Sequence, residues 1–268
     1  MTPVMADLAL ARRLERAEGL ANRAFVEARA RRNPPSGACW REVAGTLAMF
    51  DGVASPCTQT FGLGLFDPVN SGDLDVIEEF FRERGAPVIH ETCPIAQKEL
   101  WPLLADRGYR PIEFTSVMVR DLSEVGIDSG TVEVSVAGED EREVMAQTSA
   151  AGWSESMEIP ADFLEMMRTI SSAASVVSFL ARMDGQPVAA AALNINEGVA
   201  LLAGASTIPE ARRRGAQRGL LMARLAYAAG VGCDLAMMGA EPGSSSQRNA
   251  QRQGFQIVYT RIKWRLGV

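Results

Sequence analysis

The feature that most constrains the fold is an order of predicted elements that occurs twice along the chain. In each half a strand is followed by a loop, a helix, a second strand, a second helix, a glycine with an aromatic residue, and a last strand. The pairs Gly108-Tyr109 and Gly254-Phe255 take matching places in the two halves. This repeated order favours two similarly folded α+β domains, although an α/β chain can also show such an order by chance.

The individual elements follow from apolar periodicity and from turn residues. The first half predicts helices over 8–31, 74–84 and 97–106 and strands over 40–50, 58–66, 87–92 and 112–119. The second half predicts helices over 140–151, 161–170, 215–229 and 245–253 and strands over 132–136, 176–183, 188–193, 199–207, 234–238 and 256–264. A polar segment with two glycines, 120–129, separates the halves, so we expect domains at 1–125 and 130–268.

Composition excludes several classes of protein. The 268 residues are 47% hydrophobic, which suffices for one large core or two ordinary ones. A formal net charge of −6 argues against a broad basic face for nucleic acid, and one histidine with four scattered cysteines gives no pattern of metal ligands. No apolar stretch near the N-terminus has the length of a signal peptide or a membrane span. We therefore expect a cytoplasmic protein without a metal, a nucleic-acid partner or a membrane partner.

The segment 206–221 carries the chemistry. Arg212, Arg213, Arg214 and Gly215 stand where a predicted strand gives way to a predicted helix. A helix start leaves unpaired backbone N–H groups and the positive end of the helix dipole, which together attract phosphate. Glycine lets a ligand approach the backbone, and arginine adds charge-assisted hydrogen bonds. The residues alone predict a site for a pyrophosphate-type anion, and the alternative is a solvated face at the helix start.

This segment resembles the GNAT acetyltransferase superfamily, whose motif Arg/Gln-x-x-Gly-x-Gly/Ala lies between a central strand and a long helix. Arg212-x-x-Gly215-x-Gln217 matches two of the three positions, and 246–255 resembles the last helix of the family with its Gly-Phe ending. The resemblance covers 132–264. It implies an α+β, α/β/α layered architecture of two GNAT-like domains, the first of them degenerate. Each would hold a mixed, mainly antiparallel twisted sheet flanked by helices.

The resemblance also implies an activity and a co-substrate. Acetyl-CoA would place its pyrophosphate on the loop amides and its pantetheine arm where strand 199–207 parts from strand 234–238. An acetyl group would then pass to an amine of a small molecule or peptide by direct attack. The residues implied to bind acetyl-CoA are Ser206, Thr207, Ile208, Arg212, Arg213, Arg214, Gly215, Ala216, Gln217, Arg218 and Asn249.

Two residues depart from the family pattern. Gln217 stands where glycine or alanine is usual, so its side chain must point away from the diphosphate. Ala250 stands four residues before Gly254, where many members have a tyrosine that acts as general acid. The alternative to an enzyme is therefore a non-catalytic acyl-CoA-binding regulatory protein.

The remaining site residues are weaker candidates. The strand 201–207 offers no carboxylate as a general base, and Glu241 beyond the next strand is either that base or a solvated turn residue. Trp153 and Glu158 are candidates for the acceptor site, and Trp153 can equally be a packing residue. The acceptor, the length of the acyl chain and the oligomeric state stay open.

The first half repeats the architecture without this chemistry. Where the second half has its arginine-glycine loop, the first has 67–73, which contains Asp67 and Asp73 and no arginine. Two aspartates would repel a diphosphate. We expect this half to be a degenerate GNAT-like domain that packs on, or completes, the active half.

Overall fold

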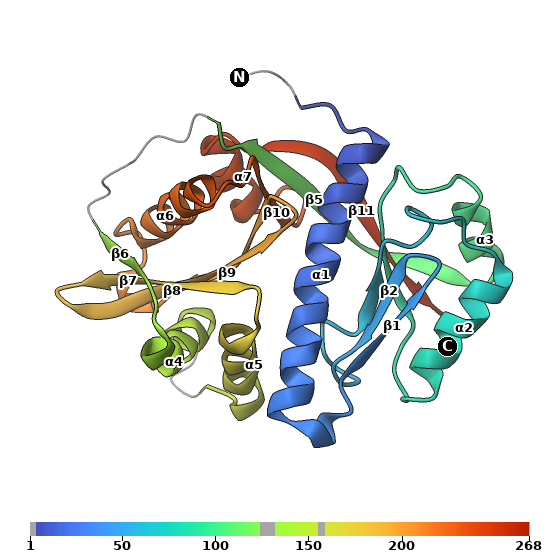
Figure 1. Ribbon diagram of the computed structural model, residues 1–268, viewed down its shortest axis with the longest axis horizontal. Coiled ribbons are helices and arrows are strands. Elements are labelled where there is room, and N and C mark those ends of the chain that lie inside the picture. Colours follow the sequence, from blue (N-terminus) through green and yellow to red (C-terminus); the bar gives the residue numbers. More distant parts are fainter. Residues whose placement is uncertain (1–3, 124–131, 155–158, 268) are drawn as a thin grey trace. The chain divides into compact units, whose positions relative to one another are not determined.

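The structure is a computed structural model that describes residues 4–123, 132–154 and 159–267 (Figure 1). The chain divides by its internal contacts into two compact units. Unit 1 consists of Met1–Arg120 and Met237–Val268, and unit 2 consists of Asp121–Ala236. Unit 1 thus contains the end of the chain as well as its beginning.

Unit 1 is built on a mixed sheet with the strand order β1-β2-β3-β4-β11-β5-β10. Strands β3 and β4 are parallel, and the pairs β1-β2, β2-β3, β4-β11 and β11-β5 are antiparallel. Its elements are α1 Leu8–Arg32, β1 Cys39–Val43, β2 Thr46–Phe50, β3 Gln59–Phe61, α2 Ser71–Arg82, β4 Ile89–Thr92, α3 Leu100–Asp106, β5 Tyr109–Asp121, β10 Leu235–Ala240, α7 Ser245–Arg252 and β11 Gln256–Leu266. The short helix η1 Pro34–Ser36 follows α1.

One segment of unit 1 that is predicted as a single strand forms two strands. The segment predicted as a single strand over 40–50 is a hairpin, in which Val43 pairs with Thr46. The turn residues Ala44 and Gly45 both have positive φ, 46° and 69°. Two-residue hairpin turns of this hand need positive φ at both positions. Alanine is rarely found there, so no turn is expected at Ala44 from its residue type.

The last strand of each half is exchanged in the sheet of unit 1. By the repeat, β5 follows β4 in the first half as β11 follows β10 in the second. In the sheet, β11 lies between β4 and β5, and β5 lies between β11 and β10. Each last strand therefore pairs with the preceding strand of the other half. The predicted domains 1–125 and 130–268 follow the sequence order, whereas the contact units follow this exchange.

The apolar core of unit 1 lies under α2 and α3. Both helices bury apolar side chains against the first strands and against Tyr109. The fully buried members from these helices are Leu74, Ile77, Phe81, Leu100 and Leu104. The alternating and helical spacing of these residues is the pattern from which the elements were predicted.

A buried ion pair joins α1 to β11. Arg261, 1% exposed, donates from Nε to Oε1 of Glu15 at 2.6 Å, and its Nη1 lies 2.7 Å from Oε2 of Glu18. The hydroxyl of Tyr259 donates to the same oxygen of Glu15 at 2.9 Å. Burial raises the pKa of Glu15, and the attraction to Arg261 opposes that rise. The pair is thus a strongly coupled, desolvated contact between the two ends of the chain.

We expect Glu15→Ala to lower the free energy of unfolding by about 3–5 kcal/mol, because Arg261 would stay buried without its nearest carboxylate. Denaturant unfolding followed by circular dichroism measures the loss. Glu79→Ala is the control, since Glu79 pairs with Arg82 on the exposed side of α2 and such pairs contribute about 1 kcal/mol or less. Equal losses in the two variants would contradict a stabilising role for the buried pair.

Unit 2 is a three-layer arrangement around an antiparallel sheet of order β9-β8-β7-β6. Figure 1 shows α6 on one face of β7, β8 and β9, with α4 and α5 on the other. The predicted α/β/α layering is therefore confirmed in this unit. Its elements are β6 Glu133–Val136, α4 Arg142–Trp153, α5 Ala161–Ser172, β7 Val176–Met183, β8 Gln186–Asn196, β9 Val199–Thr207 and α6 Ala216–Gly230, with short helices η2 Glu139–Glu141 and η3 Pro209–Ala211.

The described residues contain neither a cluster of metal ligands nor a membrane-spanning helix. Within those residues no group of three or more histidine, cysteine, aspartate or glutamate side chains is placed to hold a metal ion. No described helix is both long and apolar enough to cross a membrane. His90 is fully buried, and its Nδ1 lies 2.8 Å from the hydroxyl of Thr60, which gives it a packing role in the sheet.

Candidate functional site

The loop between β9 and α6 turns sharply before the helix begins. It runs from Ile208 through the short helix η3 to Gly215. Arg213 and Gly215 have φ of 64° and 90°, in the left-handed region. Only glycine adopts that region without cost, so Arg213 holds local backbone strain. The side chains of Arg213 and Arg214 are exposed at this turn.

The start of α6 is left without a side-chain cap. Gly215 is the N-cap residue and contributes no side-chain hydrogen bond, and the first turn contains no acidic residue. The first N–H groups of a helix have no carbonyl partner within it. The positive end of the helix dipole adds to their attraction for an anion. The exposed Arg218 on the first turn increases the positive charge at this point.

Two predicted site residues turn their side chains back onto β9. Gln217 donates from Nε2 to the hydroxyl of Thr207 at 2.9 Å. Arg212 donates from Nε to the carbonyl of Thr207 at 3.3 Å and from Nη2 to the carbonyl of Gly152 at 3.2 Å. These bonds fasten the loop to the end of β9 and to α4. Gln217 therefore directs its side chain to β9, which is compatible with its N–H serving a ligand.

The end of α4 packs very closely on the end of β9. Ser206 donates from its hydroxyl to the carbonyl of Ser149 at 2.9 Å. A Cβ atom added at Gly152 would lie 2.5 Å from the hydroxyl oxygen of Ser206 and 2.7 Å from the backbone nitrogen of Thr207. Trp153, the next residue, is 55% exposed. The predicted residues of β9, the loop and Trp153 thus belong to one tightly packed corner of unit 2.

Strand β9 carries a bulge in its middle. Ala192 pairs with Ala203 and Ala190 pairs with Ser206, so Gly204 and Ala205 stand opposite a single residue of β8. Gly204 has a φ of 59°, as the first residue of one common type of bulge requires. Within the strand only Ala203, Gly204 and Ala205 are exposed or half-buried, and all of its remaining residues are buried. The bulge therefore exposes a short run of main chain with small side chains.

A buried arginine lies behind this bulge. Arg224 of α6 is 4% exposed and donates from Nη1 to the carbonyls of Ala192 at 3.0 Å and Ala203 at 3.4 Å. Its Nε donates to the carbonyl of Leu220 at 3.2 Å. No carboxylate pairs with Arg224 in the described part of the chain, and burial lowers its pKa to about 10. Arg224 lies outside the arginine-glycine segment, and its only signal in the sequence is its spacing of four residues from Leu220 and Ala228.

The other predicted residues divide between several places. The N–H of Ile208 donates to the carbonyl of Val188 at 3.0 Å in unit 2. Glu241 and Asn249 belong to unit 1, where Glu241 is exposed after β10 and Asn249 is exposed on α7. Ala250, on the same helix, is 2% exposed. Glu158 lies outside the described residues.

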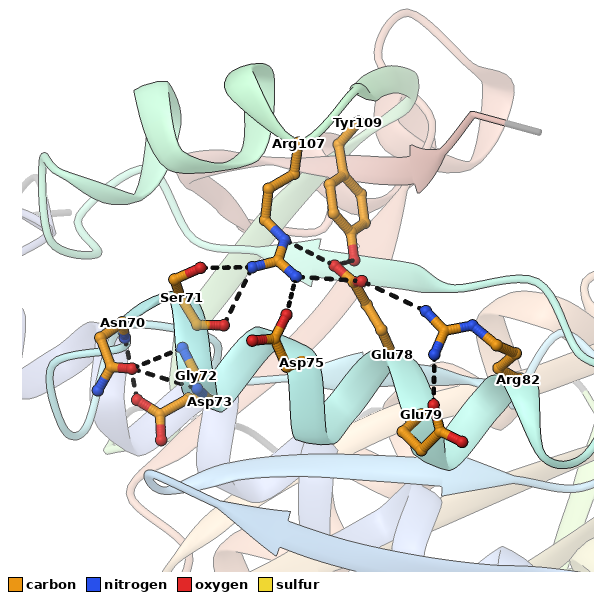
Figure 2. A network of polar contacts seen from close by, with 10 residues as sticks. All are labelled: Asn70, Ser71, Gly72, Asp73, Asp75, Glu78, Glu79, Arg82, Arg107 and Tyr109. Carbon is orange, nitrogen blue, oxygen red and sulfur yellow. Dashed lines mark hydrogen bonds and ion pairs between the residues drawn. The ribbon is translucent and has the colours of Figure 1, made fainter.

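The equivalent helix start in the first half is satisfied by its own side chains (Figure 2). Oδ1 of Asn70 accepts from the N–H groups of Gly72 at 2.8 Å and Asp73 at 3.2 Å, and Oδ2 of Asp73 accepts from the N–H of Asn70 at 2.9 Å. Arg107 donates to the carbonyl and hydroxyl of Ser71 and also pairs with Asp75. The start of α2 thus holds two aspartates and internal hydrogen bonds where the start of α6 is open.

Comparisons with known proteins match the second half of the chain to a protein family and both halves to solved structures. Residues 142–255 match the family model described as the acetyltransferase (GNAT) family. A search of curated proteins found no match. A GCN5-related N-acetyltransferase from Kribbella flavida is similar over 93% of this chain and 96% of its own, with a TM-score of 0.61 and 21% identity. One from Sphaerobacter thermophilus is similar over 77% of this chain and 71% of its own, at 0.55 and 18%.

A tandem relative covers both halves. The tandem GNAT protein from the clavulanic acid biosynthesis pathway is similar over 91% of this chain and 88% of its own, with a TM-score of 0.61 and 14% identity. The fold of this chain is therefore similar to that of GNAT proteins, including one with two GNAT domains in tandem. The match to the GNAT family model covers residues 142–255, in the second half of the chain.

We expect Gly152→Ala to lower the free energy of unfolding by about 1–3 kcal/mol, because the new methyl group would overlap Ser206 and the backbone of Thr207. Thermal unfolding measures the change. Gly230→Ala is the matched control, since Gly230 also lies in a helix of unit 2 and has nothing within 4 Å of an added Cβ atom. A Gly152→Ala variant as stable as that control would contradict the prediction, because it would mean that Ser206 and Thr207 can move to accommodate the methyl group.

Proposed function

We propose that this protein is an N-acetyltransferase that transfers an acetyl group from acetyl-CoA to an amine of a small molecule or peptide. The observation that carries the proposal is the uncapped start of α6 beside Arg213 and Arg214, within the segment that matches the GNAT family. Open N–H groups, a helix dipole and two exposed guanidinium groups form a set of donors suited to a diphosphate.

Acetyl-CoA would lie against unit 2 in one orientation. The N–H groups at the start of α6, with Arg213 and Arg214, would hold the pyrophosphate. The pantetheine arm would run along the main chain of β9 toward Ser206. The main chain of Ile208 is less suited to pair with it, because its N–H donates to Val188 and its carbonyl accepts from Ala211. The small residues of the bulge allow the main chain to be approached closely. Trp153, exposed beside this corner, is proposed to border the acceptor amine.

When bound, acetyl-CoA would supply a thioester whose acyl carbon accepts an amine nitrogen, so that the N–C bond forms as the C–S bond breaks. The chain would bind and orient both reactants, because holding them together removes most of the entropic barrier. The amine must lose a proton to a base or to water, and Glu241 as that base stays a prediction. Ala250 has no proton to give, so the leaving thiolate takes its proton from solvent. A thiol with a pKa of about 8.5 is a tolerable leaving group.

A non-catalytic acyl-CoA-binding regulator is the second candidate. The observation in its favour is the buried Ala250 in place of an acid, together with a β9 that carries no carboxylate. Both candidates share acetyl-CoA binding, and they differ only in turnover. Acetylation of any amine in a panel of polyamines, amino sugars, amino acids and peptides would exclude the regulator. Binding without turnover across that panel would favour it.

We expect an Arg213→Ala, Arg214→Ala double variant to bind acetyl-CoA at least about tenfold more weakly than the wild type, because two charge-assisted contacts to phosphate are lost. Isothermal titration calorimetry measures both affinities. An Arg110→Ala, Arg265→Ala variant removes the same charge from two exposed side chains of unit 1 and should bind as the wild type does. A folded wild type that binds no acetyl-CoA would contradict the proposed function.

A further inference from the structure

The position of Arg224 is unusual for its chemistry. It follows Leu220 by four residues and precedes Ala228 by four, and both of those neighbours are fully buried on the side of α6 that faces the sheet. An apolar residue is expected at such a position. Burial of a cation without a carboxylate is costly, and main-chain carbonyls must offset that cost. A neutral side chain of similar volume would avoid the cost altogether.

The carbonyls that Arg224 reaches are those beside the bulge. Ala192 and Ala203 form the last regular pair before the ladder between β8 and β9 is interrupted. A bulge leaves ladder groups without their usual partners. Through Nη1, Arg224 donates to both carbonyls, one on each strand. The guanidinium thus connects the two strands directly beside the bulge.

The hydrogen bond from Arg224 to Ala203 also affects the next N–H group of the strand. The carbonyl of Ala203 and the N–H of Gly204 belong to one peptide group. A hydrogen bond from a cation to that carbonyl polarises the peptide and makes its N–H a stronger donor. The run of Ala203, Gly204 and Ala205 is the open part of β9. The hydrogen bond from Arg224 to Ala203 therefore makes the N–H of Gly204 a stronger donor within the open part of β9.

We propose that Arg224 is a positioning residue for acyl transfer, which fixes the β9 bulge so that its exposed main chain meets the thioester end of acyl-CoA in one geometry. The inference rests on the proposed function, since it assumes that acyl-CoA lies along β9. It assigns Arg224 no direct contact with either reactant. Its effect should appear in the rate of acyl transfer rather than in the affinity of the pyrophosphate loop.

The first test uses the ligand-free protein and compares Arg224→Met with the wild type by amide hydrogen exchange. Methionine keeps the length and most of the volume of the side chain and removes the donors. We expect peptides covering 201–207 to exchange about tenfold faster in the variant, with the rest of β8 and β9 unchanged. Unchanged exchange in that segment would overturn the inference. Arg224→Lys, which can reach one carbonyl, should restore part of the protection and also serves if the methionine variant does not fold.

The second test separates turnover from binding. For an acetylated amine, we expect kcat of Arg224→Met to fall roughly tenfold while calorimetric affinity for acetyl-CoA changes less than about threefold, and Arg224→Lys to lie between. Arg182→Met, which removes a cation that pairs with Glu141 elsewhere in unit 2, should keep wild-type kcat. An Arg224→Met kcat equal to that control would overturn the inference alone. A wild type that binds no acetyl-CoA would instead overturn the proposed function.

Discussion

Strand β11 is hydrogen-bonded on both of its sides by strands of the first half, and the rest of unit 1 depends on that pairing. If a central strand separates from the sheet, backbone N–H and C=O groups of both neighbouring strands lose their hydrogen-bond partners. The same strand brings Arg261 against Glu15, so the first helix is held by the last strand. The two sequence halves are therefore similar in order of elements but are not separate in their pairing. The first half thus provides both pairing partners of the last strand of the second half.

Two helix starts in equivalent places of the repeat show how the halves differ. At α2, Asn70 and Asp73 satisfy one another's backbone groups, and Arg107 is already engaged with Ser71. At α6, the N-cap is Gly215, which has no side chain to cap the helix. The same fold position is thus closed by an acidic capping box in one half and left open beside arginines in the other. The open start of α6 is therefore where the proposed acyl-CoA would bind.

Local patterns predicted most of this architecture. The strands β7 and β9 begin and end where alternation and turn residues place them, and the loop before α6 was recognised from its arginines and glycine. The turn at Ala44 was missed because alanine is not a usual residue for positive φ. The exchange of last strands was missed because pairing between distant strands leaves no local signal. The spacing of four from Leu220 and Ala228 does place Arg224 on the apolar side of the helix, but it does not show that main-chain carbonyls of two strands receive the guanidinium.

Amide hydrogen exchange with and without acetyl-CoA tests the central claim most directly, because it reports on both helix starts in one experiment. The account predicts that peptides covering 212–220 exchange at least about tenfold more slowly when acetyl-CoA is bound, whereas peptides covering 69–75 do not change. Slower exchange at 69–75 with none at 212–220 would contradict the account, and so would a lack of change at both.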